Sequence, residues 1–274
     1  FCIYGVIAMS IQSIKLGKLE YLTAEGITTP HAFTTRFGGV SAGIFGSLNI
    51  GMHRGDTTEN VEKNYAILAN ALDFDLRNLV LTHQVHSDIV RAVTKQDTQG
   101  LDHHLYPECD ALITADPGTA LAVFTADCTP MLFHDPVTGA VGAAHAGWRG
   151  TAADIAGKTV KAMASAFGCE PKNIRAAIGP NLGQCHFETD LDVPAALTAA
   201  YGEEVIPFIR QKGEKYFPDL KAINALGLRQ AGVTDIDLSG SCTACAPHRF
   251  WSHRVTRGQR GSQGAIIVCK EVGK

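Results

Sequence analysis

The chain has 274 residues, of which 45% are hydrophobic and 19% charged, so it is long and apolar enough to bury a sizeable core. Its formal net charge is −3 and it has no basic run, which argues against a dedicated nucleic-acid-binding protein. No stretch approaches the ~20 apolar residues of a membrane-spanning helix. The eight cysteines are scattered and no secretory leader is visible, so we expect reduced thiols and a cytoplasmic protein.

We expect a single domain over residues 9–274, because no segment in between has the composition of a linker. The first residues, FCIYGVIA, are apolar but short and lack a basic region. The chain begins with Phe1, and Met9 can serve as the native start. Residues 1–8 are therefore expected to be an N-terminal extension that is non-native or disordered.

The first predicted elements are a strand, a glycine-rich loop and a helix. Residues 31–36 (HAFTTR) have the pattern of a strand, and Arg36 stands where it enters the loop. The loop's glycines and serines allow tight turns and close approach to a ligand, although an ordered surface connection is the simpler interpretation. Asp56 is predicted to cap the helix that follows. Its core-facing positions repeat at helical spacing: Val61, Tyr65, Leu68 and Leu72.

Short apolar strands are predicted next, and potential ligands stand at their ends. Residues 78–82 and 88–93 form two strands whose joint, HQVHS, resembles a hairpin and contains His83 and His86. Residues 109–128 contain two more strands and lead to Cys128. The apolar run 139–145 ends at His145, before the glycine-rich turn AGWRG. Strand ends can present reactive groups in a fixed geometry, so we expect the Cys128 thiol and the His145 imidazole to converge.

The remaining pattern mixes helices and strands. We predict helices at 151–167, with Thr151 as N-cap, and at 219–231, and strands at 174–180, 235–240 and 264–268. Strands outnumber helices and do not alternate regularly with them. This favours an α+β fold with mixed sheets over a doubly wound fold.

Two motifs suggest chemistry that their context does not support. Gly157-Lys158-Thr159 resembles the end of a phosphate loop, but it falls inside a predicted helix and the preceding glycine is too distant. His186 and Glu188, followed by the Cys242–Cys245 CxxC, imitate a zinc deaminase, but the proline of that signature is missing. The CxxC alone would be half of a structural zinc site without a second CxxC. We therefore interpret the pair as buried or incidental.

Cys128 and His145 together are compatible with two chemistries. The imidazole can activate the thiol as a nucleophile in a cysteine hydrolase or transferase. Alternatively, both residues bind zinc together with a further histidine, leaving a fourth position open for water or substrate. His86 is the natural third ligand because it sits at a tight joint between apolar strands. A buried thiol beside an unrelated histidine is the non-functional alternative.

Several motifs together resemble the YfiH-type family, formerly described as multicopper polyphenol oxidases or laccases. They occur in this order: TTRFGGVSAG, HQVHS, CDALIT, FTADCTPMLF, AHAGWRGT and IGPNLG. The resemblance runs from about residue 31 to the C-terminal FWSHR and GAIIV. It implies a four-layer α/β/β/α sandwich with mixed β-sheets, shared with the catalytic domain of cytotoxic necrotizing factor toxins. It also implies a purine nucleoside phosphorylase acting on adenosine and inosine, with adenosine deaminase and methylthioadenosine phosphorylase side activities.

The resemblance also assigns residues. The family's zinc ligands fall on His86, Cys128 and His145, whereas His83 matches no ligand position. The substrates that the resemblance implies are a purine nucleoside and phosphate. A guanidinium beside exposed helix N–H groups can bind an anion, so Arg149 at the start of the 151–167 helix is a candidate phosphate ligand, and Arg36 is a second candidate for phosphate or ribose. Alternatives are a copper-dependent polyphenol oxidase, although no HxH spacing occurs, and a Cys–His hydrolase acting in cell-wall peptide editing. Purely structural zinc suits three ligands poorly, and the sequence does not decide the oligomeric state.

Overall fold

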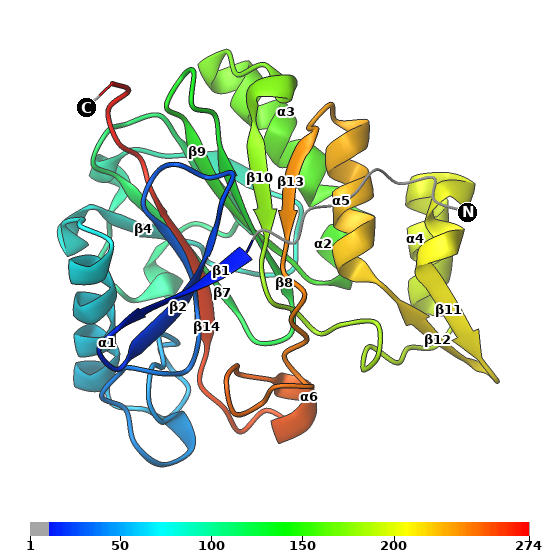
Figure 1. The fold of residues 1–274 in the computed structure, drawn as a ribbon, viewed down its shortest axis with the longest axis horizontal. Helices are drawn as coiled ribbons and strands as arrows, with labels where there is room; N and C mark the ends of the chain where they lie inside the picture. Colours follow the sequence, from blue (N-terminus) through cyan, green and yellow to red (C-terminus); the bar gives the residue numbers. More distant parts are fainter. Residues whose placement is uncertain (1–10, 274) are drawn as a thin grey trace.

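Two six-stranded sheets organise the computed structural model, which describes residues 11–273 (Figure 1). The first sheet has the order β1 (Ile11–Leu16), β2 (Leu19–Ala24), β3 (His31–Thr34), β14 (Gln263–Val268), β7 (Ala120–Thr125) and β4 (Leu79–Leu81). The second has the order β13 (Asp235–Leu238), β10 (Arg175–Ile178), β8 (Thr129–His134), β9 (Val141–Ala146), β6 (Ala111–Thr114) and β5 (Val90–Ala92). Both sheets are mixed, because β4–β7, β5–β6 and β10–β13 pair in parallel and the other pairs are antiparallel.

Helices and a small hairpin complete the fold. The α-helices are α1 (Thr58–Ala71), α2 (Trp148–Ala152), α3 (Ile155–Phe167), α4 (Asp192–Tyr201), α5 (Leu220–Gln230) and α6 (His253–Thr256). The short 3₁₀ segments are η1 (Gly43–Phe45), η2 (Leu76–Asn78), η3 (Lys95–Asp97), η4 (His103–Leu105), η5 (Pro171–Asn173) and η6 (Gly202–Phe208). Strands β11 (Ile209–Lys212) and β12 (Lys215–Pro218) pair beside α4. No helix among residues 11–273 is long and apolar enough to span a membrane.

Strand alternation explains the layers. Along β8, Leu132 joins the core shared with the first sheet, whereas Met131 and Phe133 pack with residues of α3 and α5. Strands β7 and β14 of the first sheet contact β8 and β9 of the second. The predicted stripe of α1, from Val61 to Leu72, is buried in the same core as the first sheet. The predicted α+β sandwich is therefore confirmed, with α1 against one sheet and α3 and α5 against the other.

The predicted hairpin around HQVHS is wrong. Strand β4 pairs with β7 in the first sheet, and β5 pairs with β6 in the second, so the joint crosses from one sheet to the other. Both strands are short, β5 includes the exposed Arg91, and neither sequence carries information about its partner. Strand β8, which follows Cys128 directly, was not predicted, and neither were β1, β2, α4 or the β11–β12 pair.

Two predicted helix starts are also wrong. Helix α1 is capped by the Thr57 side chain, which accepts from the Asn60 N–H at 3.2 Å, and Asp56 stands one residue earlier. The 151–167 segment is two helices, because Asp154 adopts left-handed backbone angles (φ 55°) and caps α3 through the Gly157 N–H. The prediction for residues 1–8 lies outside the described residues, and the assignment of residues 9–274 to one domain stays a prediction.

Candidate functional site

The two crossovers between the sheets and the end of β9 bring the predicted ligands together. His86 lies in the connection from β4 to β5, Cys128 in the connection from β7 to β8, and His145 near the end of β9. Their ligand atoms all lie within 4.8 Å of one another. His86 is exposed, Cys128 half-buried and His145 buried, so this triad is open on one side. The predicted convergence is thus present.

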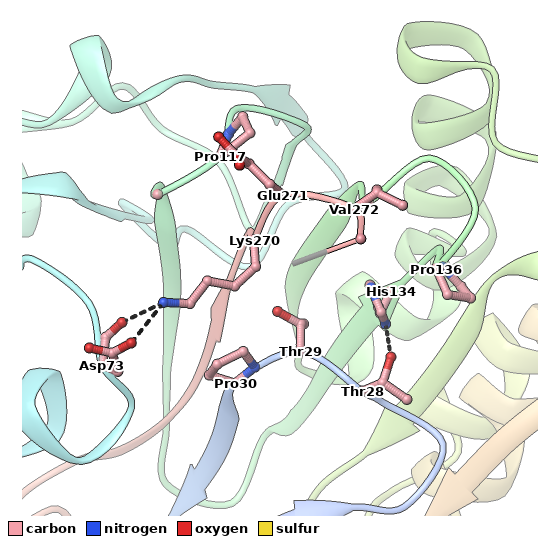
Figure 2. A pocket seen from close by; sticks show the side chains of 13 residues that line it. Thr28, Thr29, Pro30, Asp73, Pro117, His134, Pro136, Lys270, Glu271 and Val272 are labelled. Carbon is pink, nitrogen blue, oxygen red and sulfur yellow. Dashed lines mark hydrogen bonds and ion pairs between the residues drawn. The ribbon is translucent and has the colours of Figure 1, made fainter.

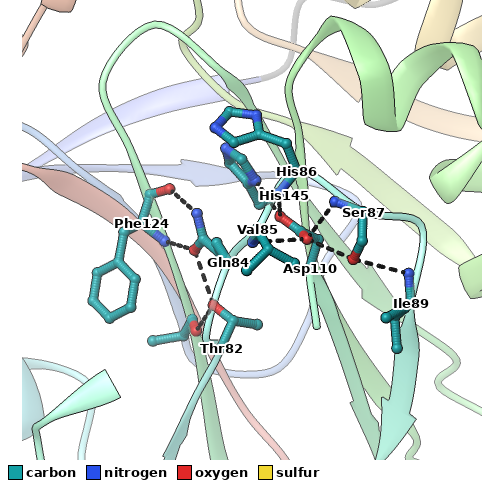
Figure 3. Close-up of polar contacts among 10 residues, drawn as sticks. Thr82, Gln84, Val85, His86, Ser87, Ile89, Asp110, Phe124 and His145 are labelled. Atoms are coloured by element: carbon teal, nitrogen blue, oxygen red, sulfur yellow. Dashed lines mark hydrogen bonds and ion pairs between the residues drawn. The ribbon is translucent and has the colours of Figure 1, made fainter. Parts of the chain in front are cut away.

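A buried carboxylate, that of Asp110, contacts His145 and the loop that carries His86 (Figure 3). Asp110 precedes β6 and is fully buried, and its Oδ1 lies 2.8 Å from His145 Nδ1. The same carboxylate accepts backbone N–H groups of Val85 and His86 at 3.2 Å and of Ser87 at 2.7 Å. A histidine that gives one ring N–H to a carboxylate presents its other nitrogen in a fixed orientation. Asp110 therefore orients His145 and also holds the loop that carries His86.

Two features of the backbone allow the ligands to come together. His86 has φ 60°, a left-handed conformation that is uncommon for a residue with a side chain and that clusters at functional sites. Gly147 leaves room beside it, because a Cβ at Gly147 would lie 2.5 Å from His86 Nδ1 and 3.5 Å from Cys128 Sγ. The glycine that follows β9 is thus a steric requirement of the triad.

The charges of the site favour a protonated His145 when no metal is present. Burial lowers the pKa of His145, but the nearby Cys128 and the Asp110 hydrogen bond outweigh burial and raise that pKa to about 9. Burial, followed by the charge of His145, lowers the pKa of His86. The pKa of Asp110 is lowered because its hydrogen bonds to His145 and Ser87 outweigh its burial. The donor set, one thiol and two imidazoles with an oriented ring, fits a borderline-soft cation such as Zn²⁺ or copper.

Two cavities flank the triad, and His86 and Cys128 line both. One, of about 140 Å³, is also lined by Arg54 and Arg260. The other, of about 400 Å³, is lined by Trp148 and other mostly apolar residues. The triad thus separates a cationic cavity from an aromatic one.

The cationic cavity contains two neighbouring guanidinium groups. Arg260 is 8% exposed, and its Nε is buried with no hydrogen-bond partner among residues 11–273. Its other contacts are with the Gly261 carbonyl at 2.9 Å and Ser262 Oγ at 3.1 Å. Burial, and then the charge of Arg54, lower the pKa of Arg260 to about 10. A buried guanidinium beside a second, exposed one suits an anionic ligand.

The structure places the two predicted arginines differently. Arg149 lines the aromatic cavity and stacks on Trp148, with 4.3 Å between its Cζ and the ring centroid. Arg36 lines neither cavity around the triad. Its guanidinium donates to the carbonyls of Gly46 and Pro247 and lies 3.9 Å from the Trp251 ring centroid. Arg36 therefore stabilises the glycine-rich loop through these hydrogen bonds.

A larger cavity, of about 760 Å³, lies elsewhere (Figure 2). It is lined by Thr28, His134, Lys270 and residues near them, with Lys270 paired to Asp73 at 3.2 Å. None of the triad residues lines it, and its only imidazole, that of His134, contacts Thr28 Oγ1 at 3.5 Å. We therefore place the chemistry at the triad rather than in this larger cavity.

The fold and the site together define an α+β sandwich protein with a candidate three-ligand metal centre at one end of its two sheets. Residues 30–270 match the family described as multi-copper polyphenol oxidoreductase laccase, and the chain belongs to this family.

Relatives and structural neighbours of this chain support the family assignment. The chain is 41% identical over 251 residues to a purine nucleoside phosphorylase of Deinococcus radiodurans, covering 91% of this chain and 92% of that protein. It is 36% identical over 221 residues to the purine nucleoside phosphorylase YfiH of Escherichia coli, covering 81% and 86%. The crystal structure of YlmD from Geobacillus stearothermophilus superposes with a TM-score of 0.89 at 36% identity, covering 96% of this chain and 100% of that one. The resemblance to the YfiH-type family is confirmed.

Proposed function

We propose that this chain is a cytoplasmic, zinc-dependent purine nucleoside phosphorylase. Its substrates are adenosine and inosine, with methylthioadenosine as a further substrate, and its products are the free base and ribose 1-phosphate. The observation that carries the proposal is the position of the triad between a cationic and an aromatic cavity. Relatives named purine nucleoside phosphorylases, at up to 41% identity, support it.

Phosphate would occupy the cationic cavity. Arg54 and Arg260 supply charge-assisted donors there, and the unpartnered Arg260 Nε gains a partner when an anion binds. This replaces both predicted phosphate ligands, because the Arg36 guanidinium is engaged by backbone carbonyls and Arg149 lines the other cavity.

The purine base would occupy the aromatic cavity. Trp148 and Phe187 offer flat apolar surfaces, and Arg149 lies over the Trp148 ring at the rim. A nucleoside bound in this way places its sugar near His86 and Cys128, the residues that both cavities share. The scissile bond then lies at the junction of the two cavities.

The reaction exchanges one bond at the anomeric carbon. The C1′–N bond breaks, a phosphate oxygen bonds to C1′, and the proton that the hydrogen phosphate loses passes to the nitrogen of the leaving base. His86, Cys128 and His145 would hold the zinc, while Asp110 keeps the proton on His145 Nδ1. When bound, zinc supplies Lewis-acid polarisation of a substrate oxygen or lowers the pKa of water, and the latter would support adenosine deamination as a side activity. Arg54 and Arg260 align the phosphate with the sugar, which reduces the entropic part of the barrier.

Zinc is preferred to copper for this reaction. Phosphorolysis involves no change of oxidation state, and zinc suits a three-ligand site with an open position. A copper-dependent phenol oxidation would use the same thiolate and imidazoles but needs a redox metal. Activity that follows copper rather than zinc content would favour that alternative.

A thiol hydrolase is the second candidate. Asp110, His145 and Cys128 are arranged as carboxylate, imidazole and thiol, with the first contact at 2.8 Å. The same order of groups activates nucleophilic cysteines in hydrolases. Such an enzyme would act on amides, such as those of cell-wall peptides, and would work without metal.

Phosphate-dependent release of base from adenosine and inosine tests the proposal, on protein of known metal content beside a Cys128→Ala variant. We expect ribose 1-phosphate formation that tracks zinc content and disappears in the variant. Zinc-loaded protein that turns over no purine nucleoside would refute the phosphorylase. Amide hydrolysis by metal-free protein would then identify the thiol hydrolase.

The phosphate site is tested separately by Arg260→Gln, with Arg257→Gln as the control because Arg257 lies in the same loop but is exposed. Loss of a charge-assisted hydrogen bond costs about 1.5–3 kcal/mol, so we expect the KM for phosphate to rise roughly 10- to 100-fold in Arg260→Gln. The KM for the nucleoside should stay within about twofold, as should both constants in the control. Equal effects of the two substitutions would place phosphate elsewhere.

A further inference from the structure

Four potential ligands outside the triad converge where two segments meet. Cys185 and His186 lie between β10 and α4, and Cys242 and Cys245 lie between β13 and α6. Their ligand atoms lie within 4.8 Å of one another. His186 Nδ1 is 3.2 Å from Cys185 Sγ, 3.7 Å from Cys242 Sγ and 3.5 Å from Cys245 Sγ. The CxxC is therefore not a buried pair, and a Cys-His dipeptide from a different loop lies beside it.

These separations match the edges of a zinc tetrahedron. Zn–S bonds of about 2.3 Å and Zn–N bonds of about 2.0–2.1 Å place two sulfurs about 3.8 Å apart and a sulfur about 3.6 Å from a nitrogen. The sulfurs of Cys185 and Cys245 are 3.6 Å apart, and the three distances from His186 bracket the second value. Three thiols and one imidazole form a complete ligand set, so this cluster has no open position for substrate.

The surroundings suit bound thiolates. The Gly183 N–H donates to Cys242 Sγ at 3.2 Å, and a Cβ at Gly183 would approach that sulfur to 3.4 Å and Cys185 Sγ to 3.5 Å. Lys221 donates to the Ser241 carbonyl at 3.2 Å and interacts electrostatically with both of these thiols. Three thiolates and one dication carry a net charge of −1, which the Lys221 ammonium offsets.

We propose that Cys185, His186, Cys242 and Cys245 bind one zinc ion in a closed structural site, separate from the His86–Cys128–His145 triad. The ion would join the segment after β10 to the segment after β13. A disulfide between Cys185 and Cys245 is the competing state, but it would use two of the four converging groups and leave the others unexplained.

The joined segments border the triad. Thr243 Oγ1 donates to Asp127 Oδ1 at 2.6 Å, and the Arg254 N–H donates to Asp127 Oδ2 at 2.6 Å. The Arg254 guanidinium also donates to the His186 carbonyl at 2.8 Å. Asp127 immediately precedes Cys128 and has φ 86°, so its carboxylate contacts hold an unfavourable backbone conformation next to a metal ligand. The second ion thus stabilises the backbone that presents Cys128.

The segment that contains Cys185 and His186 also forms a wall of the aromatic cavity. Leu182 and Phe187, on either side of this dipeptide, line that cavity. This consequence rests on the proposed function, because that cavity is the proposed base site. Loss of the second ion should therefore raise the KM for the nucleoside more than the KM for phosphate.

The test is zinc content per chain, measured after loading with zinc and removal of excess. We expect about two zinc ions in the unmodified protein, about one in Cys128→Ala and about one in Cys242→Ser/Cys245→Ser. His248→Ala, an exposed histidine in the same segment, should keep both. A Cys242→Ser/Cys245→Ser protein that binds as much zinc as the unmodified protein would overturn the proposal. The count is independent of catalysis, so failure of the phosphorylase would leave it standing.

Alkylation of the unmodified protein gives a test that needs no folded variant. We expect Cys185, Cys242 and Cys245 to be protected from a thiol reagent in zinc-loaded protein and to react after chelation, as mapped by peptide mass spectrometry. Cys185 and Cys245 are exposed, so only a bound ion or a disulfide can protect them. Recovery of a Cys185–Cys245 disulfide-linked peptide from the zinc-loaded protein would overturn the proposal.

Discussion

Asp110 illustrates how much of the site depends on a single buried carboxylate. It fixes the ring of His145 and accepts three N–H groups of the loop around His86. Substitution of a residue that orients a metal ligand typically reduces metal affinity or activity 10- to 100-fold. We expect Asp110→Asn to weaken zinc binding at the triad by about that factor, as measured by competition with a chromophoric chelator.

Asp88 provides the matched control for this substitution. It lies close to the same loop but is partly exposed, and it pairs with Lys158 at the surface. Asp88→Asn should leave zinc affinity within about twofold, since surface pairs contribute about 0–1 kcal/mol. A similar loss in both variants would mean that general loop stability, and not orientation of His145, explains the effect.

Substitution of Gly147 tests whether the triad needs the space beside His86. A methyl group at this position would lie 2.5 Å from His86 Nδ1, too close for the ring to remain in place. We expect Gly147→Ala to lose zinc from the triad and most catalytic activity while its circular dichroism spectrum is preserved, because the clash is confined to the ligand. Zinc affinity and turnover equal to those of the unmodified protein would contradict this account of the glycine.

At the residue scale, the sequence predicted the three ligands better than it predicted the residues around them, Asp110 and Arg260. His86, Cys128 and His145 each stand beside an apolar strand, where a polar reactive group is conspicuous. Asp110 opens the CDALIT strand and could have been noticed as an acid next to buried positions. Arg260 carries no local signal, because it reaches the cavity only through the pairing of β14 with β7.

At the scale of elements, strand β8 is fully buried and ends in a titratable side chain. His134 is 7% exposed, and burial together with the charge of Arg175 lowers its pKa to about 4. The unfolded chain protonates near its ordinary value of about 6.5, so between these two values the unfolded state binds more protons. The contribution of His134 to the free energy of unfolding therefore falls as pH decreases from about 6.5 to about 4, by about 3 kcal/mol at most.

The corresponding prediction concerns His134→Gln. We expect its free energy of unfolding in urea to fall less steeply than that of the unmodified protein between about pH 6.5 and about pH 4.5. His248→Gln is the control, because His248 is exposed. Parallel pH profiles for His134→Gln and the unmodified protein would show that His134 does not contribute to acid sensitivity.

Local pattern located α1, α5 and most strands of the two sheets, but it missed β1, β2, β8, α4 and the β11–β12 pair, and it did not fix element ends or partners. The stripe from Val61 to Leu72 defined α1, yet the hydroxyl of Thr57 rather than the carboxylate of Asp56 caps it. The break at Asp154 depends on a left-handed backbone that packing determines. The HQVHS joint resembled a hairpin because sequence distance was the only available guide to pairing.

At the scale of the whole molecule, the layered sandwich was expected from the family resemblance, whereas composition and pattern alone indicated only mixed sheets. The order of strands in each sheet places β14, the last strand, between β3 and β7. No local feature of residues 263–268 indicates this. The Cys185–His186–Cys242–Cys245 cluster was missed for the same reason, since its halves meet only when β10 and β13 pair.

Two of the triad ligands lie in crossovers between sheets, and the third lies near the end of a strand in the second sheet. The ligands therefore meet only when the two sheets are docked, and a chain with separated sheets presents isolated groups of low affinity. A ligand that binds only the native state adds about 1.4 kcal/mol to the unfolding free energy for each tenfold rise of its free concentration above Kd. Urea denaturation in zinc-buffered solutions should show this slope for each bound ion, and Cys128→Ala should lose the part that the triad contributes. The resistance of the sandwich to unfolding would then report how much free zinc surrounds the protein.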